Sequence, residues 1–251
     1  MPFTLHLLSR ACLGLLIPGI FAQTPPPSPY LRTPAPRQLA WHQLEYYAFV
    51  HLGPNTFTDE EWGRSQSLPD VFSPSALDTD QWASTFASAG MTGMILTAKH
   101  HDGMALWTTN TTTYSIANSA WAKKRISQGL ETDIVRLAAA SAKKFNLKFG
   151  IYLSPWDIHR DPAIPKPKLS GTIYDEPQIF GDSSPGDYNA LYAAQLTELV
   201  TLRHLGDGSE MGIFELWLDG AFGSSTIQTL NWTLFRDIIR MHQSGAIMWG
   251  Y

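Results

Sequence analysis

Two carboxylates and an indole alternate along one short stretch of the sequence. Glu215, Trp217 and Asp219 occupy every second position of residues 213–219, and Gly220 follows at once. If this stretch is a β-strand, the three side chains share one face and Asp219 stands at the end of the strand. A carboxylate in that place can attack the anomeric carbon of a sugar, or it can cap the turn that begins at Gly220. Position alone leaves both roles open.

Glu215 is the nearest acid that could work together with Asp219. Glycosidases place their two carboxyl groups about 5–5.5 Å apart when they retain the anomeric configuration and about 6.5–9.5 Å apart when they invert it. Four residues along a strand span roughly 13 Å, which exceeds both separations. We therefore expect Glu215 to make a hydrogen bond inside the protein rather than to donate a proton to a substrate.

Histidines stand at the ends of two other apolar stretches. His51 ends one of them, and the pair His100 and His101 ends the other. Imidazoles can hydrogen-bond neighbouring hydroxyls of a ligand, or they can bind a metal ion. Zinc-dependent barrels usually carry H-x-H on the first strand, whereas Gly53 follows His51 at the corresponding position. The pattern therefore favours a ligand site without a metal over a metal centre.

Glu61 and Trp62 form an acid–indole pair in the loop after the first predicted strand. The carboxylate could take hydroxyls of a sugar while the indole covers an apolar C–H face, or the pair could be a solvated acid beside a loop anchor. Trp156 and Asp157 form a second, weaker pair, which follows the fixed turn indicated by Pro155.

The elements that position these residues follow from periodicity and from capping residues. Apolar stretches predict four strands, at residues 45–51, 93–100, 147–154 and 212–219, and residues 246–251 are a candidate for a fifth. Amphipathic patterns between them predict helices at residues 78–90, 131–145, 187–202 and 229–243. Strands and helices that alternate in this way indicate a parallel sheet covered by helices.

Two architectures fit this alternation, a TIM barrel and a doubly wound open sheet. The first loop, residues 51–64, lacks the G-x-G-x-x-G pattern of a dinucleotide site. Polar residues at the carboxyl ends of strands favour the barrel: His51, His100, His101, Ser154 and Asp219. The predicted fold class is α/β, of the (β/α)8 TIM-barrel type. A closed barrel has eight strands, so we expect a barrel truncated after about four to five βα units.

Composition and the N-terminal residues indicate which partners and which cellular location to expect. A net charge of −4 without a dense Lys/Arg stripe disfavours nucleic acid as a partner. Residues 1–22 are predicted to be a signal peptide, because their apolar stretch is too short to span a membrane. Residues 23–36 are predicted to form a Pro-rich linker, and residues 37–251 are predicted to form the N-terminal part of the barrel. We expect a secreted protein with no membrane attachment after cleavage.

Cysteine usage and glycosylation triplets agree with that location. Cys12 is the single cysteine and lies inside the predicted signal peptide, so the mature form would have no disulfide. Asn110 and Asn231 each begin an N-x-T triplet, which gives modest support for secretion because such triplets are common by chance.

Four stretches together resemble the α-L-fucosidases of glycoside hydrolase family 29, in particular the α-1,3/1,4-fucosidase branch. They are residues 37–63, 94–107, 147–157 and 214–221. The resemblance implies a retaining exo-α-L-fucosidase that hydrolyses terminal α-L-fucosyl linkages of oligosaccharides or glycoconjugates and needs no metal or organic cofactor. It makes Asp219 the nucleophile. It also implies that fucose is contacted by His51, Glu61, Trp62, His100, His101, Tyr152 and Trp217.

The sequence departs from the family in ways that bear on activity. In the family the general acid/base is a Glu on a strand–loop well beyond the position of Asp219, and this residue is not present in the chain. We expect little turnover from these residues alone, since general acid catalysis contributes roughly 10²–10⁴-fold. Two alternatives remain open: a non-catalytic remnant that binds fucose or another carbohydrate, and a metal-dependent barrel hydrolase.

Overall fold

The computed structural model describes residues 27–28, 31–63, 67–160, 185–219 and 230–250. The predicted signal peptide and part of the linker lie outside these residues. The chain divides into two units, residues 1–33 and 34–251, and all helices and strands discussed below belong to the second unit.

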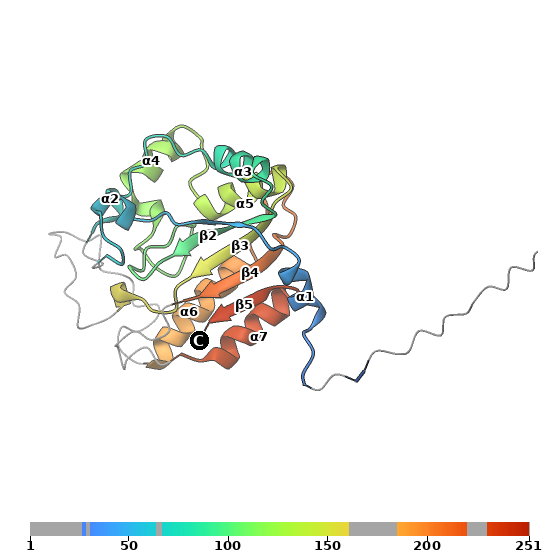
Figure 1. Ribbon diagram of the computed structural model, residues 1–251. Helices are drawn as coiled ribbons and strands as arrows, with labels where there is room; N and C mark the ends of the chain where they lie inside the picture. The colour runs from blue at the N-terminus through green and yellow to red at the C-terminus, as the bar shows by residue number, and fades with distance from the viewer. Residues whose placement is uncertain (1–26, 29–30, 64–66, 161–184, 220–229, 251) are drawn as a thin grey trace, which may run out of the picture. The chain divides into compact units, whose positions relative to one another are not determined.

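Five strands form one parallel sheet in the order β1-β2-β3-β4-β5 (Figure 1). They are β1 Ala48–Val50, β2 Gly93–Lys99, β3 Lys148–Leu153, β4 Ile213–Leu218 and β5 Ile247–Gly250. Each strand pairs with the next one along the chain, so the order never reverses. A doubly wound sheet requires such a reversal, whereas a barrel does not.

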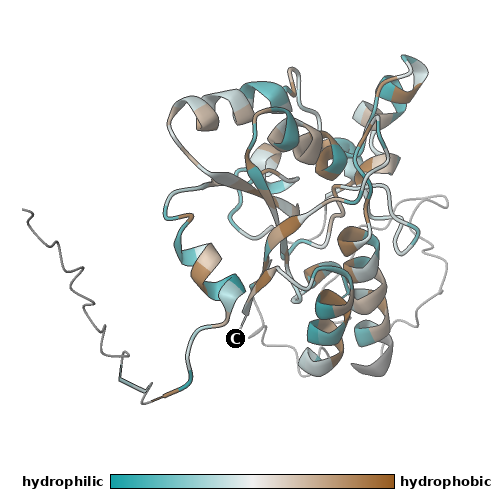
Figure 2. Ribbon diagram, turned by 90° about the vertical axis from the view of Figure 1, so that its right-hand side faces the viewer, coloured by the Kyte–Doolittle hydropathy of each residue, from teal (hydrophilic) through white to brown (hydrophobic). Residues whose placement is uncertain are grey.

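One long helix follows each of the first four strands, as the sequence predicts. These helices are α3 Thr79–Ser88, α5 Ile134–Lys144, α6 Pro185–Val200 and α7 Trp232–His242. Helices α3 and α5 lie side by side against β2, and α6 packs along α7 (Figure 1). In Figure 2 the helices carry both hydrophilic and hydrophobic residues, as expected of helices that cover a sheet with one face.

Three short helices were not predicted from the sequence. They are α1 Pro36–His42, α2 Asn55–Thr58 and α4 Ala120–Ser127. Each is eight residues or shorter, so none contains enough turns to show a clear helical period. Single 3-10 turns occur at Pro69–Val71, Ile116–Asn118 and Ile158–Arg160.

Side-chain caps fix where the long helices begin. Asp78 accepts a hydrogen bond from the backbone N–H of Gln81 at 2.9 Å and so starts α3. Asp133 accepts from the N–H of Arg136 at 2.9 Å, so α5 begins three residues later than the predicted position 131.

The first strand is shorter than predicted, for a reason that lies in its backbone. Residues 45–51 were expected to be extended, but only Ala48–Val50 pair with β2. Glu45 has a φ of 52°, which lies in the left-handed region and cannot continue a strand. The chain therefore enters β1 from a turn, and His51 follows the strand directly.

The centre of the sheet is almost entirely buried. Every residue of β2 is buried, including Lys99 at its carboxyl end. Gly150 of β3 allows close packing here, because a Cβ atom at this position would lie 2.9 Å from Cγ1 of Ile95. This close packing holds the ends of the strands in place, and the candidate site residues lie at those ends.

Candidate active site

The polar residues singled out at strand ends do gather at one edge of the sheet. His51 follows β1, His100 and His101 follow β2, Ser154 follows β3, and Asp219 follows β4. Because the strands are parallel, their carboxyl ends meet on the same side. The predicted placement at this edge is confirmed.

Asp219 is held by a tyrosine from the neighbouring strand. The hydroxyl of Tyr152 donates to Oδ2 of Asp219 at 3.1 Å. Burial, together with the charge and the hydrogen bond of Asp219, raises the pKa of Tyr152 well above its usual value. The phenol therefore keeps its proton and acts as a neutral donor to the carboxylate.

The three histidines form one continuous cluster. The ring centroids of His51 and His100 are 4.6 Å apart, and those of His100 and His101 are 4.1 Å apart. Burial, followed by the neighbouring histidines, lowers the pKa of His100 to about 3. Burial also lowers the pKa values of His51 and His101. The cluster thus offers neutral imidazoles, which suit the hydroxyls of an uncharged ligand.

An aromatic wall adjoins this polar cluster. Phe49 contacts Tyr152 and Trp217 edge-on, with centroids 5.9 and 5.5 Å apart. Trp217 stacks on Trp249 of β5 at 5.8 Å. Phe49 and Trp249 are both partly exposed, so this wall presents apolar surface beside Asp219.

Glu215 fixes the orientation of Trp217 in the aromatic wall by hydrogen bonding. The fully buried carboxylate accepts the indole N–H of Trp41 at 2.7 Å and the indole N–H of Trp217. Tyr47 also hydrogen-bonds Glu215. Burial raises the pKa of Glu215 despite these donors. The expectation of an interior hydrogen bond for Glu215 is confirmed.

The acid–indole pair of the first loop is only partly joined to the cluster. The ring of Trp62 lies 5.7 Å from His101 and 5.6 Å from Trp156, and 51% of its surface is exposed. Glu61 is exposed, and within the described residues no hydrogen bond ties it to the histidines. The structure therefore brings the indole to the site but gives the carboxylate no contact there.

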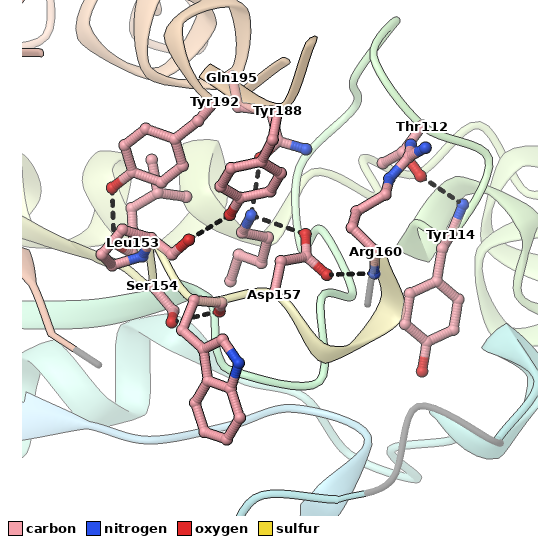
Figure 3. Close-up of polar contacts among 12 residues, drawn as sticks. Thr112, Tyr114, Leu153, Ser154, Asp157, Arg160, Tyr188, Tyr192 and Gln195 are labelled. Carbon is pink, nitrogen blue, oxygen red and sulfur yellow. Dashed lines mark hydrogen bonds and ion pairs between the residues drawn. The ribbon is translucent and has the colours of Figure 1, made fainter. Parts of the chain in front are cut away.

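A buried ion pair supports the loop after β3. Nζ of Lys99 lies 3.0 Å from Oδ2 of Asp157 and 2.9 Å from Oε1 of Gln195 (Figure 3). Both charged side chains are almost completely buried. The hydroxyl of Tyr192 donates to the carbonyl of Leu153 at 2.9 Å, which ties α6 to the end of β3. Asp157, a weak site candidate in the sequence, is a structural partner of Lys99.

Sequence reasoning missed several residues of this region. Phe49 and Trp249 lie on strands that were predicted, yet their common wall depends on how the sheet curves. The period-two rule could have found Phe49, because it alternates with Tyr47 and His51. Asp102, which follows the tandem histidines, is also buried and accepts from Nδ2 of Asn55 at 3.3 Å.

Within the described part of the chain, no group of three or more His, Cys, Asp and Glu side chains is arranged to hold a metal ion. None of the helices in these residues is both long enough and apolar enough to cross a membrane.

Proteins of known family match most of the chain. The alpha-L-fucosidase family model matches residues 37–247. A relative from Oryza sativa subsp. japonica is 43% identical over 207 residues, which are 82% of this chain and 34% of that protein. Alpha-L-fucosidase 1 of Arabidopsis thaliana is 39% identical over 199 residues, which are 79% of this chain and 33% of that protein. The chain spans about a third of the length of these curated relatives.

Solved structures give the same family. A glycoside hydrolase 29 family member from an unknown rumen bacterium matches with a TM-score of 0.66 and 36% identity, over 86% of this chain and 36% of that one. A Ruminococcus gnavus GH29 fucosidase in complex with fucose matches with a TM-score of 0.62 and 28% identity, over 84% and 40%. These matches and the sequential parallel sheet confirm the predicted barrel-type fold. The chain belongs to the alpha-L-fucosidase family, glycoside hydrolase family 29.

Proposed function

We propose that this chain supplies the nucleophile and the fucose-binding groups of a retaining exo-α-L-fucosidase. Its substrates would be terminal α-L-fucosyl linkages of oligosaccharides or glycoconjugates. The observation that carries the proposal is the carboxylate of Asp219, held by a neutral phenol at the end of β4 beside neutral histidines and an aromatic wall.

In the first step a carboxylate oxygen of Asp219 forms a bond to C1 of fucose, while the bond from C1 to the leaving oxygen breaks. The leaving oxygen takes a proton from a general acid, a role that we assign to none of the described residues. Water then attacks C1 and passes a proton to the same group, which now acts as a base, while the bond from C1 to Asp219 breaks, so that the configuration at C1 is retained. The hydrogen bond from Tyr152 orients the attacking carboxylate throughout.

The other residues recognise the sugar. The neutral rings of His51, His100 and His101 can exchange hydrogen bonds with its hydroxyls. Trp217 and Trp62 offer apolar surface to the C6 methyl and the ring hydrogens. Glu61, which the resemblance also assigns to fucose, is an exposed carboxylate that can accept hydrogen bonds from hydroxyls of the sugar.

Binding and turnover of the Asp219→Asn variant test the proposal. We expect wild-type protein and Asp219→Asn to bind L-fucose with affinities that differ by no more than severalfold. Tryptophan fluorescence measures this binding. Hydrolysis of an aryl α-L-fucoside should be undetectable in Asp219→Asn and unchanged in the control Asp207→Asn, an exposed acid remote from the strand ends. Measurable hydrolysis that is equal in wild type and Asp219→Asn would contradict the nucleophile assignment.

The same assay separates a second candidate, a non-catalytic fucose-binding protein. We keep this candidate because none of the described residues is assigned the role of general acid. Fucose binding by wild type without any hydrolysis would support it. Absence of both binding and hydrolysis would contradict both candidates.

We also propose that the protein is secreted after cleavage of residues 1–22. Support comes from the apolar stretch in residues 1–22 and from the exposed positions of Asn110 and Asn231, the first residues of two N-x-T triplets. Expression in a eukaryotic secretion host should release protein that begins near residue 23 and loses mass on treatment with an amide-cleaving glycosidase. Retention of residues 1–22 in the cell-associated protein would argue against secretion.

A further inference from the structure

The hydroxyl of Ser154 lies within hydrogen-bonding distance of several groups at the end of β3. Its Oγ atom is 2.6 Å from the carbonyl oxygen of Trp156 (Figure 3). It is 3.4 Å from the carbonyl oxygen of Asp219. It is also 2.7 Å from Nδ1 of His101. The hydroxyl of Tyr152 is a further neighbour, and its own proton goes to Asp219.

A serine hydroxyl has one proton to share among these neighbours. Carbonyl oxygens only accept, so the short contact between Ser154 and Trp156 requires that proton. The hydroxyl of Tyr152 donates its own proton to Asp219, so it has no proton to donate to Ser154. The contact with His101 must then run the other way, with an N–H of the imidazole donating to Oγ.

We infer that Ser154 is a positioning residue that holds the proton of His101 on Nδ1, so that Nε2 offers a lone pair to one hydroxyl of a bound fucoside. This inference rests on the proposed function for its ligand, whereas the proton position rests on the hydrogen bonds alone. His101 is thereby an acceptor that selects a hydroxyl able to donate.

Aromatic rings pack around His101, and within the described residues only its Nδ1 edge has a hydrogen-bond partner. Trp156 and Trp62 approach the ring with centroids 5.1 and 5.7 Å away, and His100 approaches to 4.1 Å. The Nδ1 edge faces Ser154, and 5% of the residue surface remains exposed. Within the described residues no other hydrogen bond to the His101 ring is found. Burial lowers the pKa of this histidine, with the charge of Asp219 opposing the shift, and so keeps the ring neutral.

Nitrogen NMR of the imidazole rings reads the proton position directly. In protein labelled with 15N at histidine, the protonated and bare ring nitrogens resonate far apart, and the His101 signals are identified by their loss in His101→Gln. We expect wild type to show a protonated Nδ1 and a bare Nε2. Ser154→Ala should populate both tautomers, and Ser154→Thr, which keeps the hydroxyl, should restore the wild-type signals.

Ser141→Ala is the matched control for removal of a buried hydroxyl. Ser141 is 3% exposed and hydrogen-bonds Thr79 at 2.8 Å, on helices remote from the strand ends. This variant should leave the His101 signals unchanged. A protonated Nε2 in the wild-type protein overturns the inference, whatever the serine variants do.

The role of Nε2 towards the sugar is tested with methyl α-L-fucoside and its monodeoxy and monofluoro analogues. A fluorine can accept but cannot donate, so replacing the hydroxyl that faces His101 by hydrogen or by fluorine should weaken binding equally, by about tenfold. In Ser154→Ala the loss of affinity from the parent fucoside to these analogues should be smaller than in wild type. A double-mutant cycle measures this change. If every monofluoro analogue binds like the parent fucoside, the acceptor role is wrong.

The two proposals fail separately. Wild type that binds the fucoside but carries its proton on Nε2 leaves the proposed function standing and refutes the inference. Wild type with the proton on Nδ1 that binds no fucoside refutes the proposed function and the acceptor role towards the sugar, while the hydrogen-bond assignment of Ser154 stands.

Discussion

The hydroxyl of Tyr152 lies 3.1 Å from Oδ2 of Asp219, across the junction between β3 and β4. Tyr152 is paired in register with Trp217, two residues before the acid, so the tyrosine reaches forward along the sheet to meet it. This contact links the proposed nucleophile to the well-packed centre of the sheet rather than to a loop. A rigid strand thereby fixes the carboxylate, as accurate attack on a sugar requires.

Removing that hydroxyl should slow the chemical step. In Tyr152→Phe the carboxylate loses a hydrogen bond to a charged group, which is worth about 1.5–3 kcal/mol, or about 10- to 100-fold in rate. We expect the rate of hydrolysis of an aryl fucoside to fall by this factor, with fucose affinity changed by less than about threefold. The control Tyr46→Phe removes a hydroxyl from a tyrosine that is 53% exposed. An unchanged rate in Tyr152→Phe would show that the contact has no catalytic role.

Glu215 should contribute to stability rather than to proton transfer. In Glu215→Ala the indole N–H groups of Trp41 and Trp217 lose their acceptor, which should cost roughly 2–3 kcal/mol of unfolding free energy. Glu215→Gln keeps one acceptor and should lose less. Urea denaturation measures both variants, with Glu210→Ala, an exposed acid, as the control. A Glu215→Ala variant as stable as wild type would refute this role.

Gly103 should be intolerant of any side chain. It has a φ of 90°, and a Cβ atom there would lie 2.3 Å from Oδ1 of Asp157. Gly129 has a φ of 70° but nothing within 4 Å of such an atom, so Gly129→Ala measures backbone strain alone, about 1–2 kcal/mol. We expect Gly103→Ala to lose a further 1–3 kcal/mol or so from the clash. Equal losses in the two variants would mean that the loop adapts freely.

Asp102 should make stability fall as the pH rises towards neutrality. Burial raises the pKa of Asp102 to about 7, opposed by the hydrogen bond from the N–H of Met104. The folded state therefore keeps a proton between about pH 4 and 7 that the unfolded state releases, and the free energy of unfolding declines across this range. The opposite shift of His100 acts from about pH 3 to 6.5, where its contribution to stability rises with pH.

The variant Asp102→Asn isolates the first effect. Subtracting its unfolding free energy from that of wild type at each pH removes the contribution of His100 and leaves the decline due to Asp102. A difference that stays constant from pH 4 to 7 would contradict a raised pKa for Asp102.

The sequence predicts the architecture and the placement of the site to a large extent. All five strands, the last of them as a candidate, and the four long helices could be placed, because long apolar and amphipathic stretches carry a clear period. The polar strand ends then follow from parallel pairing, which brings His51, His100 and Asp219 to one edge. The role of Glu215 also follows from strand spacing alone.

What sequence reasoning missed depends on three-dimensional packing. The short β1 follows from the left-handed backbone of Glu45, which a glutamate does not signal. The wall of Phe49, Trp217 and Trp249 depends on the curvature of the sheet. The direction of the hydrogen bond between Ser154 and His101 becomes readable only when every neighbour of the hydroxyl is known.

The most direct test of the central claim is covalent trapping of the nucleophile by a 2-deoxy-2-fluoro-α-L-fucosyl fluoride. Fluoride leaves without being protonated, so formation of the sugar–enzyme bond depends on the attacking carboxylate alone. Peptide mass mapping should find one fluorofucosyl group on Asp219 in wild type and in Asp207→Asn, and none in Asp219→Asn. A fluorofucosyl group on any other residue would contradict the assignment of Asp219.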